Sequence, residues 1–128
     1  MPCSYSIGQA AELTEVSVDT LRFYEKKGLM LKLQRASSGH RRYSQQDIEW
    51  LRFVLCLKST GMPLEAIKRY RDLLEQGKES ELERLQILQS HREQTQLQIQ
   101  QLEANLAHVE RKIAFYTEEL GQQFVSTE

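Results

Sequence analysis

Apolar residues recur at alternating steps of three and four along the second half of the chain. The series is Leu85, Leu88, Ile99, Leu102, Leu106, Val109, Ile113, Tyr116 and Leu120, with Arg92 and Thr95 in the two places between Leu88 and Ile99. This spacing is typical of the a and d positions of a coiled coil. Because no Gly or Pro interrupts residues 79–120, the pattern predicts one helix about 60 Å long. A stripe this narrow needs a partner helix, most simply that of a second copy, so we expect a homodimer.

Two short helical segments are predicted near the N-terminus. Ser6 is a suitable N-cap for a helix over residues 7–13, and Ser17 is placed to cap a second helix over residues 18–27. Gly28 follows in the C-cap position. Two short helices joined by a tight turn form a helix-turn-helix, although an ordinary helical hairpin shows the same pattern.

A β-hairpin is predicted next. Residues 29–33 and residues 41–43 are short extended pieces around the turn signal Ser37-Ser38-Gly39. The hairpin carries Arg35, His40, Arg41 and Arg42. After a helix-turn-helix, such a basic hairpin is typical of a wing that contacts phosphates while the second helix enters the major groove. A solvated basic loop is the alternative reading.

Two more helices are predicted before the long one. Ser44 and Asp47 have the spacing of an N-terminal cap, and a helix should run from Gln45 to about Thr60. A further helix begins at Pro63, where the missing N–H of proline costs little, and runs to Leu74. The inward positions of these two helices are Ile48, Trp50, Leu51, Val54, Leu55, Ile67, Tyr70, Leu73 and Leu74.

Charge is distributed unevenly over the 128 residues. The net charge is −1 and the pI is about 6.3, which alone argues against a nucleic-acid partner. Residues 1–75, however, hold 12 Lys/Arg against 9 Asp/Glu, whereas residues 76–128 hold 5 against 9. Within residues 20–42 the balance is +6. A basic patch joined to an acidic stalk favours a nucleic-acid-binding head.

Several classes of protein are not indicated. Two cysteines, Cys3 and Cys56, make no disulfide framework. No apolar run reaches the length of a membrane span, and a signal-peptide core is missing, so we expect a soluble cytoplasmic protein. Because no nucleophile, base and orienting group have a recognisable spacing, we expect neither an enzyme nor a cofactor.

The ordered motifs of residues 5–70 resemble those of the MerR family of bacterial transcriptional regulators. The matching pieces are Tyr5-Ser6-Ile7-Gly8-Gln9-Ala10-Ala11, Thr20-Leu21-Arg22-Phe23-Tyr24-Glu25, Gly28-Leu29, Arg35, Gly39-His40-Arg41-Arg42-Tyr43, Asp47-Ile48, Leu57-Lys58 and Gly61-Met62. The resemblance implies a mainly α fold: a winged helix-turn-helix domain followed by a long dimerisation helix in an antiparallel coiled coil. We therefore expect a DNA-binding domain over residues 1–77, a dimerisation helix over 78–120 and a tail over 121–128.

The resemblance also implies the function and the residues that contact DNA. A regulator of this family binds double-stranded promoter DNA as a homodimer and distorts it so that RNA polymerase can engage the promoter. The residues expected to contact DNA are Ser17, Thr20, Arg22, Tyr24, Arg35, His40, Arg41, Arg42, Tyr43 and Lys58. This chain departs from the family at Phe23 and at His40, where many members have Tyr, and at Lys32-Leu33, where many have proline.

The effector is predicted from the cysteines. Metal-sensing members carry cysteines near the end of the dimerisation helix, and none follows Cys56 here, so no metal site is expected. Cys56 resembles the single cysteine of the subgroup related to NmlR and AdhR, which is implicated in responses to aldehydes and electrophiles. A cation such as Lys58 or Arg52 could activate its thiolate. The alternative is an inert Cys56 in the core and an unknown small-molecule or partner effector.

One alternative belongs to another class of protein. A coiled-coil adaptor could use a basic head to bind a protein. Such an adaptor would lack the steep salt dependence that phosphate contacts produce in DNA binding.

Overall fold

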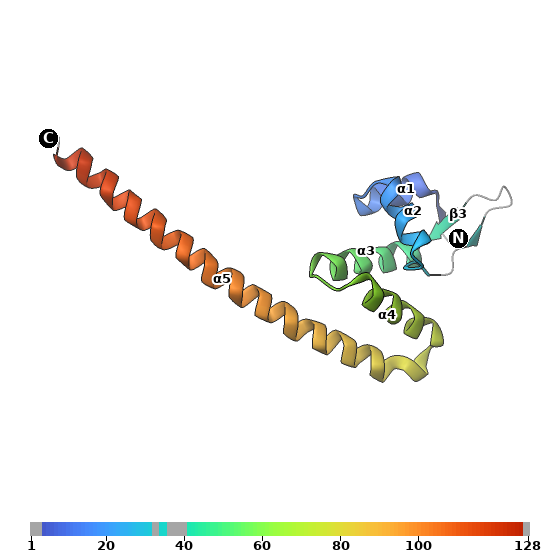
Figure 1. Ribbon diagram of the computed structural model, residues 1–128. Coiled ribbons are helices and arrows are strands. Elements are labelled where there is room, and N and C mark those ends of the chain that lie inside the picture. Colours follow the sequence, from blue (N-terminus) through green and yellow to red (C-terminus); the bar gives the residue numbers. More distant parts are fainter. Residues whose placement is uncertain (1–3, 32–33, 36–40, 127–128) are drawn as a thin grey trace. The chain divides into compact units, whose positions relative to one another are not determined.

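The computed structural model describes residues 4–31, 34–35 and 41–126 of the chain (Figure 1). In chain order its elements are β1 (Ser4–Tyr5), α1 (Ile7–Thr14), α2 (Val18–Lys26), β2 (Gln34–Arg35), β3 (Arg41–Ser44), α3 (Gln45–Ser59), α4 (Leu64–Gln76), the 3-10 turn η1 (Lys78–Ser80) and α5 (Glu81–Ser126). The chain divides into two compact units, the head through Gln89 and the stalk from Ser90 onward. The predicted mainly α fold, a winged helix-turn-helix and a long helix, is confirmed.

Three of the predicted helix starts are confirmed with a serine as the N-cap, and α4 begins after Pro63, as predicted, without a side-chain cap. Ser6 and Gln9 form a complete capping box at α1, and Ser44 and Asp47 form one at α3. Ser17 accepts a hydrogen bond from the backbone N–H of Thr20 at the start of α2. These side chains satisfy backbone N–H groups that have no partner inside the helix.

The turn between α1 and α2 contains a residue in the left-handed region. Glu15 has φ 58° and ψ 37°, a conformation that costs an L-residue free energy and is usually taken by glycine. The N–H of Val16 donates to the Ala11 carbonyl at 3.1 Å, which closes the end of α1. This bond sends the chain sharply toward Ser17 and fixes how α2 leaves α1.

The predicted hairpin is present as β2 and β3, and a third strand joins it. Its second strand was predicted correctly, but its first strand lies at Gln34–Arg35 and not within residues 29–33. Within the described strands the order is β1-β3-β2, with both pairings antiparallel. Strand β1 was not predicted, because two residues carry no alternating pattern that could reveal a strand. The hairpin's turn, Ser37-Ser38-Gly39, lies outside the described residues.

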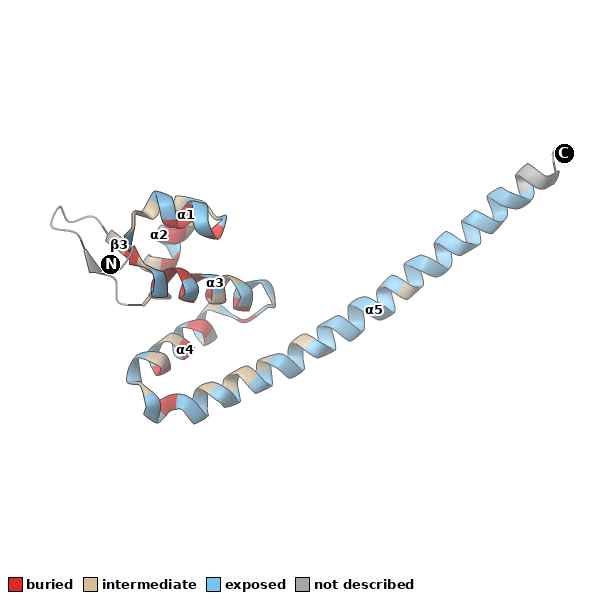
Figure 2. Cartoon of the chain, turned by 180° about the vertical axis from the view of Figure 1, so that it is seen from behind, coloured by how far each residue is buried: buried red, intermediate tan, exposed pale blue. Residues whose placement is uncertain are grey.

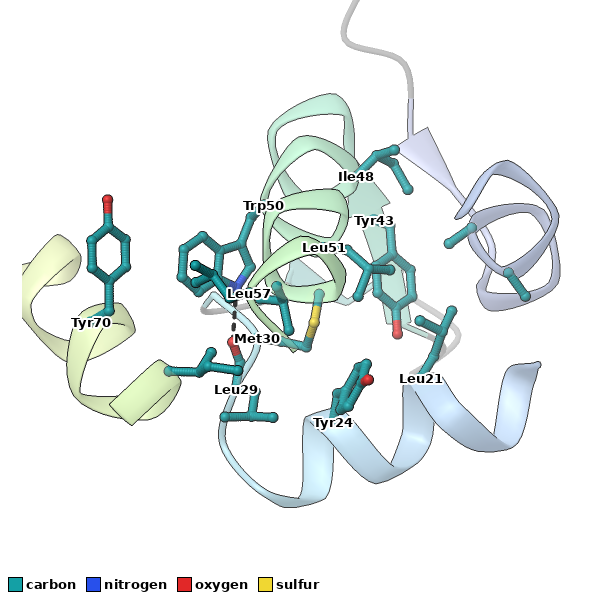
Figure 3. Close-up of a cluster of buried hydrophobic side chains, with 14 of the residues drawn as sticks. Leu21, Tyr24, Leu29, Met30, Tyr43, Ile48, Trp50, Leu51, Leu57 and Tyr70 are labelled. Atoms are coloured by element: carbon teal, nitrogen blue, oxygen red, sulfur yellow. Dashed lines mark hydrogen bonds between the residues drawn. The ribbon is translucent and has the colours of Figure 1, made fainter. Parts of the chain in front are cut away.

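The core of the head lies between α1, α2, α3, α4 and the strand β3 (Figure 3). Leu21, Tyr43 and Leu51 are fully buried in it. The rings of Trp50 and Tyr70 stack at 5.9 Å between centroids, which joins α3 to α4. The predicted inward positions are confirmed apart from Leu55 and Leu74, which are partly buried, and Leu57 is an unpredicted core residue.

Helix α5 differs from its prediction at both ends. Ile87 and Leu88 pack against the core of their own head, so the head extends to Gln89 rather than to Gly77. Leu88 was assigned to the dimer seam, but part of its surface is covered within its own chain. At the other end the helix continues through Gly121 to Ser126, because a helical glycine costs only about 1 kcal/mol and need not end a helix. The expected tail after residue 120 is therefore helical through Ser126.

Most residues of the stalk from Ser90 to Gln122 are exposed (Figure 2). Large apolar side chains from Ile99 to Leu120 are about half exposed or more. None of the helices in the described ranges has the length and apolarity that a membrane span requires.

Candidate nucleic-acid interface

The outward face of α2 carries charged side chains and one aromatic ring. Asp19, Arg22, Phe23 and Lys26 follow the spacing of a single helix face, and all four are exposed. Arg22 Nη1 lies 3.9 Å from Asp19 Oδ1, and the ammonium of Lys27 lies 5.6 Å from the centroid of the Phe23 ring. Because an exposed ion pair of this length is weak, Arg22 can exchange Asp19 for a phosphate or a base edge.

Two hydroxyl groups meet at the N-terminus of α2. Ser17 Oγ and Thr20 Oγ1 are 2.9 Å apart, and Ser17 Oγ accepts from the Thr20 N–H at 3.1 Å. Ser17 is exposed and Thr20 is half-buried. Each hydroxyl retains hydrogen-bonding capacity, and the positive end of the helix dipole favours an anion here. The structure thus groups Ser17, Thr20 and Arg22 on the first turns of α2, as a recognition helix requires.

The wing places its arginines on paired strands. Arg35 pairs with Arg41 in the register of β2 and β3, while their side chains and the whole of His40 lie outside the described residues. Arg42 reaches across to β1, where its Nη2 donates to the Ser4 hydroxyl at 3.0 Å and to the Ser4 carbonyl at 3.3 Å. The guanidinium of Arg42 is partly exposed and has further N–H donors beyond these bonds.

Two predicted contact residues lie in the core instead of on the surface. Tyr24 is 5 % exposed and Tyr43 is fully buried. The Tyr43 hydroxyl donates to the carboxylate of Glu25, so it joins the wing strand β3 to the recognition helix. Their burial indicates that these two tyrosines position the interface, and a direct side-chain contact with DNA remains only a prediction.

Helix α3 presents the predicted thiol and the predicted cation near its end. Cys56 and Lys58 are both exposed, so Cys56 is not the buried core residue that the alternative reading assumed. Residues two apart on a helix do not share a face, so Lys58 is not placed to activate this thiol. Arg52, four residues before Cys56, donates to the Leu13 carbonyl at 3.3 Å. In the part of the chain that the structure describes, His, Cys, Asp and Glu form no cluster suited to a metal ion.

Sequence profiles decide the family. The profile described as "MerR HTH family regulatory protein" matches residues 5–74, and the profile described as "MerR, DNA binding" matches residues 48–112. The first match alone covers more than half of the chain and includes the interface described above. The chain belongs to the MerR family. This MerR-family regulator is a DNA-binding transcription regulator and not an enzyme.

Individual relatives agree with this assignment. An uncharacterized HTH-type transcriptional regulator of Haemophilus influenzae is 38 % identical over 113 residues, which span 88 % of this chain and 84 % of that protein. The regulator AdhR of Bacillus subtilis is 34 % identical over 88 residues, 69 % of this chain and 63 % of AdhR. The crystal structure of HiNmlR, a MerR family regulator lacking the sensor domain and bound to promoter DNA, matches with a TM-score of 0.85 at 37 % identity, covering 91 % of this chain and 92 % of HiNmlR.

Two cations of the interface were missed at the level of individual residues. Lys26 and Lys27 are exposed at the end of α2, and the ammonium of Lys27 lies over the Phe23 ring. In the sequence they counted only toward the basic balance of residues 20–42. The spacing of Asp19, Arg22 and Lys26 was the available signal, because positions three and four apart share a helix face.

The assignment to the MerR family also favours a regulator over the coiled-coil adaptor.

Proposed function

We propose that this MerR-family regulator binds promoter DNA as a homodimer whose stalks pair antiparallel, with one head on each half of a two-fold-related operator. The observation that carries the proposal is the apolar stripe of the stalk. Its members are exposed by 49–68 % in the single chain: Ile99, Leu102, Leu106, Val109, Ile113, Tyr116 and Leu120. A second stalk would remove this surface from water, which contributes roughly 25 cal/mol per Å². Dimers then match the symmetry of a palindromic operator.

Disulfide cross-linking tests the orientation of the stalks. In a background with Cys3→Ser and Cys56→Ser, single cysteines replace Leu102 or Leu120 on the stripe. An antiparallel pair brings a residue close to its own copy only near the two-fold axis, so at most one of these variants should form a covalent dimer. Dimers from both variants would indicate parallel stalks, and a monomer in sedimentation would contradict the homodimer.

Operator binding tests the head. The exposed Arg22 and the N-terminus of α2 support contacts with bases and phosphates. Arg22→Ala should weaken binding to the regulator's own promoter, and affinity should fall steeply with salt, as counterion release requires. The matched control is Arg111→Ala on the stalk, which should leave the affinity unchanged. Binding without salt dependence would favour the adaptor.

Distortion of the promoter is the proposed means of control. The recognition helix and the wing of each head would contact the DNA backbone at separate points. The free energy of these contacts would offset the cost of bending the DNA, which is a form of indirect readout. RNA polymerase would engage the distorted promoter. Gel mobility of circularly permuted promoter fragments measures the bend, and transcription in vitro measures the outcome. Unbent DNA in a complex that still activates transcription would contradict this step.

Cys56 is the proposed effector site for aldehydes or other electrophiles. Its thiol is exposed on α3, and the chain is similar to AdhR. The thiolate would attack the carbonyl carbon of the aldehyde, forming a C–S bond while the carbonyl oxygen takes up a proton. Intact mass after treatment with formaldehyde or methylglyoxal tests this, with Cys56→Ser and Cys3→Ser as paired variants. Equal induction of transcription in Cys56→Ser and the wild type would establish the alternative, an inert Cys56 and another effector.

A further inference from the structure

The recognition helix ends in a closed cap that sets the direction of the following segment. Helix α2 is followed by residues 28–31, here called the connector, which lead to the wing. The N–H of Gly28 donates to the Glu25 carbonyl at 3.1 Å, and the N–H of Leu29 donates to the Tyr24 carbonyl at 3.0 Å. With Gly28 at φ +75°, this is a Schellman motif. The cap therefore fixes the direction in which the connector leaves α2.

Side chains from two other helices hold the next two carbonyl groups of the connector. Trp50 Nε1 on α3 donates to the Leu29 carbonyl at 2.8 Å, as the dashed line in Figure 3 shows. Arg71 Nε on α4 donates to the Met30 carbonyl at 2.8 Å. Leu29 and Met30 are themselves 1 % and 4 % exposed. The connector is thus bonded to both α3 and α4.

Arg71 is held in place by two carboxylates. Its Nη1 lies 3.0 Å from Asp72 Oδ1, its Nη2 lies 3.1 Å from Glu75 Oε1, and its side chain is 22 % exposed. A planar guanidinium can make three such contacts in fixed directions, whereas the ammonium of a lysine cannot reproduce the fork. The Met30 carbonyl is therefore bonded to a guanidinium that two carboxylates of α4 orient.

The far end of α4 is joined to the start of α5 by side-chain hydrogen bonds. Ser80 is 3 % exposed, and its hydroxyl donates to the Leu73 and Gly77 carbonyls. Arg84 donates to Ser80 Oγ at 2.9 Å and to the Gly77 carbonyl at 3.0 Å. Within the head, the first turns of α5 and helix α4 therefore form one bonded corner. A displacement of this corner would be passed to the connector through Arg71.

We propose that Arg71 is a positioning residue for DNA binding, which sets the location of the wing relative to the recognition helix by holding the Met30 carbonyl. The inference rests on the proposed function, in which both α2 and the wing contact DNA. Arg71 itself lies on α4 and faces the connector. Its loss should therefore affect the contacts of the wing and leave those of α2 in place.

Two double-mutant cycles on the full-length dimer test this role. Arg71→Met is combined with Arg42→Ala on the wing and, separately, with Arg22→Ala on α2, and operator affinity is measured for every variant. If Arg71 acts through the wing, the fold loss of operator affinity caused by Arg42→Ala should be at least about threefold smaller in the Arg71→Met background than in the wild type. The cost of Arg22→Ala should be the same in both backgrounds. Arg69→Met is the matched control, because Arg69 is exposed on the same helix and pairs with Glu83 at 2.8 Å rather than with the connector.

Each outcome has a defined meaning. Unchanged affinity in Arg71→Met would overturn the positioning role. Independent costs in both cycles would also overturn it, because they would indicate a general loss of folded protein, which reduces all contacts alike. Thermal melting monitors that loss, and Arg71→Lys, which keeps the charge but not the planar fork of donors, repeats both cycles if Arg71→Met does not fold. If Arg42→Ala alone leaves affinity unchanged, the wing contact of the proposed function fails and the inference falls with it. If Arg42→Ala weakens binding and only the coupling is missing, the proposed function stands without the inference.

Discussion

The head and the stalk differ in how they bury apolar surface. The head buries Leu21, Leu29, Ile48 and Leu51 within its own chain to 1 % exposure or less, and serine caps close its helices. The stalk leaves Leu102 and Ile113 exposed by 68 % and 59 %. The head therefore contains the partners that it needs, whereas the stalk depends on a second molecule. Stability should accordingly be independent of protein concentration in the head and dependent on it in the stalk.

The largest expected effect comes from breaking the stripe on the stalk. Leu102→Glu combined with Ile113→Glu places four charges in the proposed dimer seam, because each copy contributes two. We expect monomers in sedimentation and a loss of operator affinity of about a thousandfold, since one head no longer holds the other near its half-site. The control is Leu97→Glu, which replaces a residue that is 61 % exposed and lies off the stripe. Dimers in the double variant would show that another surface pairs the chains.

A substitution in the core should break the head without acting through the stalk. Leu51 is fully buried, so Leu51→Ala should lower the free energy of unfolding by about 3 kcal/mol through lost burial and a cavity. Urea unfolding followed by circular dichroism measures the change. Leu97→Ala on the stalk should cost far less, and equal losses in both variants would contradict the division into a packed head and an open stalk.

The capping box of α3 should make a smaller contribution. Ser44 Oγ accepts from the Asp47 N–H at 3.1 Å. Ser44→Ala should therefore lower the free energy of unfolding of the head by about 1 kcal/mol. Gln46→Ala, which changes an exposed residue of the same turn, serves as the control. A larger loss in the control would show that the cap is not the stabilising feature.

The smallest change should stabilise the head. Glu15 has φ 58°, and Glu15→Gly removes the cost of the left-handed conformation while it adds freedom to the unfolded chain. The net expectation is a gain of about 0.5 kcal/mol in the free energy of unfolding. Glu12→Gly, inside α1, should instead lose about 1 kcal/mol. A loss in both variants would mean that the side chain of Glu15 stabilises the turn.

The features that the sequence predicted correctly are those set by neighbouring residues. Ser6, Ser17 and Ser44 cap their helices because a cap involves only the next few residues. Strand β1 was missed because its pairing of Tyr5 with Tyr43 joins distant segments and leaves no local pattern.

The candidate site divides in the same way. Arg22 was assigned through the family resemblance, which rests on a local motif, and the structure places it on the exposed face of α2. The burial of Tyr24 and Tyr43 depends on tertiary packing, including the bond from Tyr43 to Glu25. Similarly, the bond from Arg71 to Met30 spans 41 positions, so no local pattern could have indicated it.

The bond between Trp50 and Leu29 gives the head an optical reporter. Trp50 is the chain's single tryptophan, is 6 % exposed and stacks on Tyr70 while its N–H bonds to the connector. Indole emission shifts to longer wavelength when water reaches the ring. The intrinsic fluorescence of the unlabelled protein therefore reads out one place, the junction of α3, α4 and the connector. Following it during titration with operator DNA would record, in real time, whether this junction opens as the regulator binds.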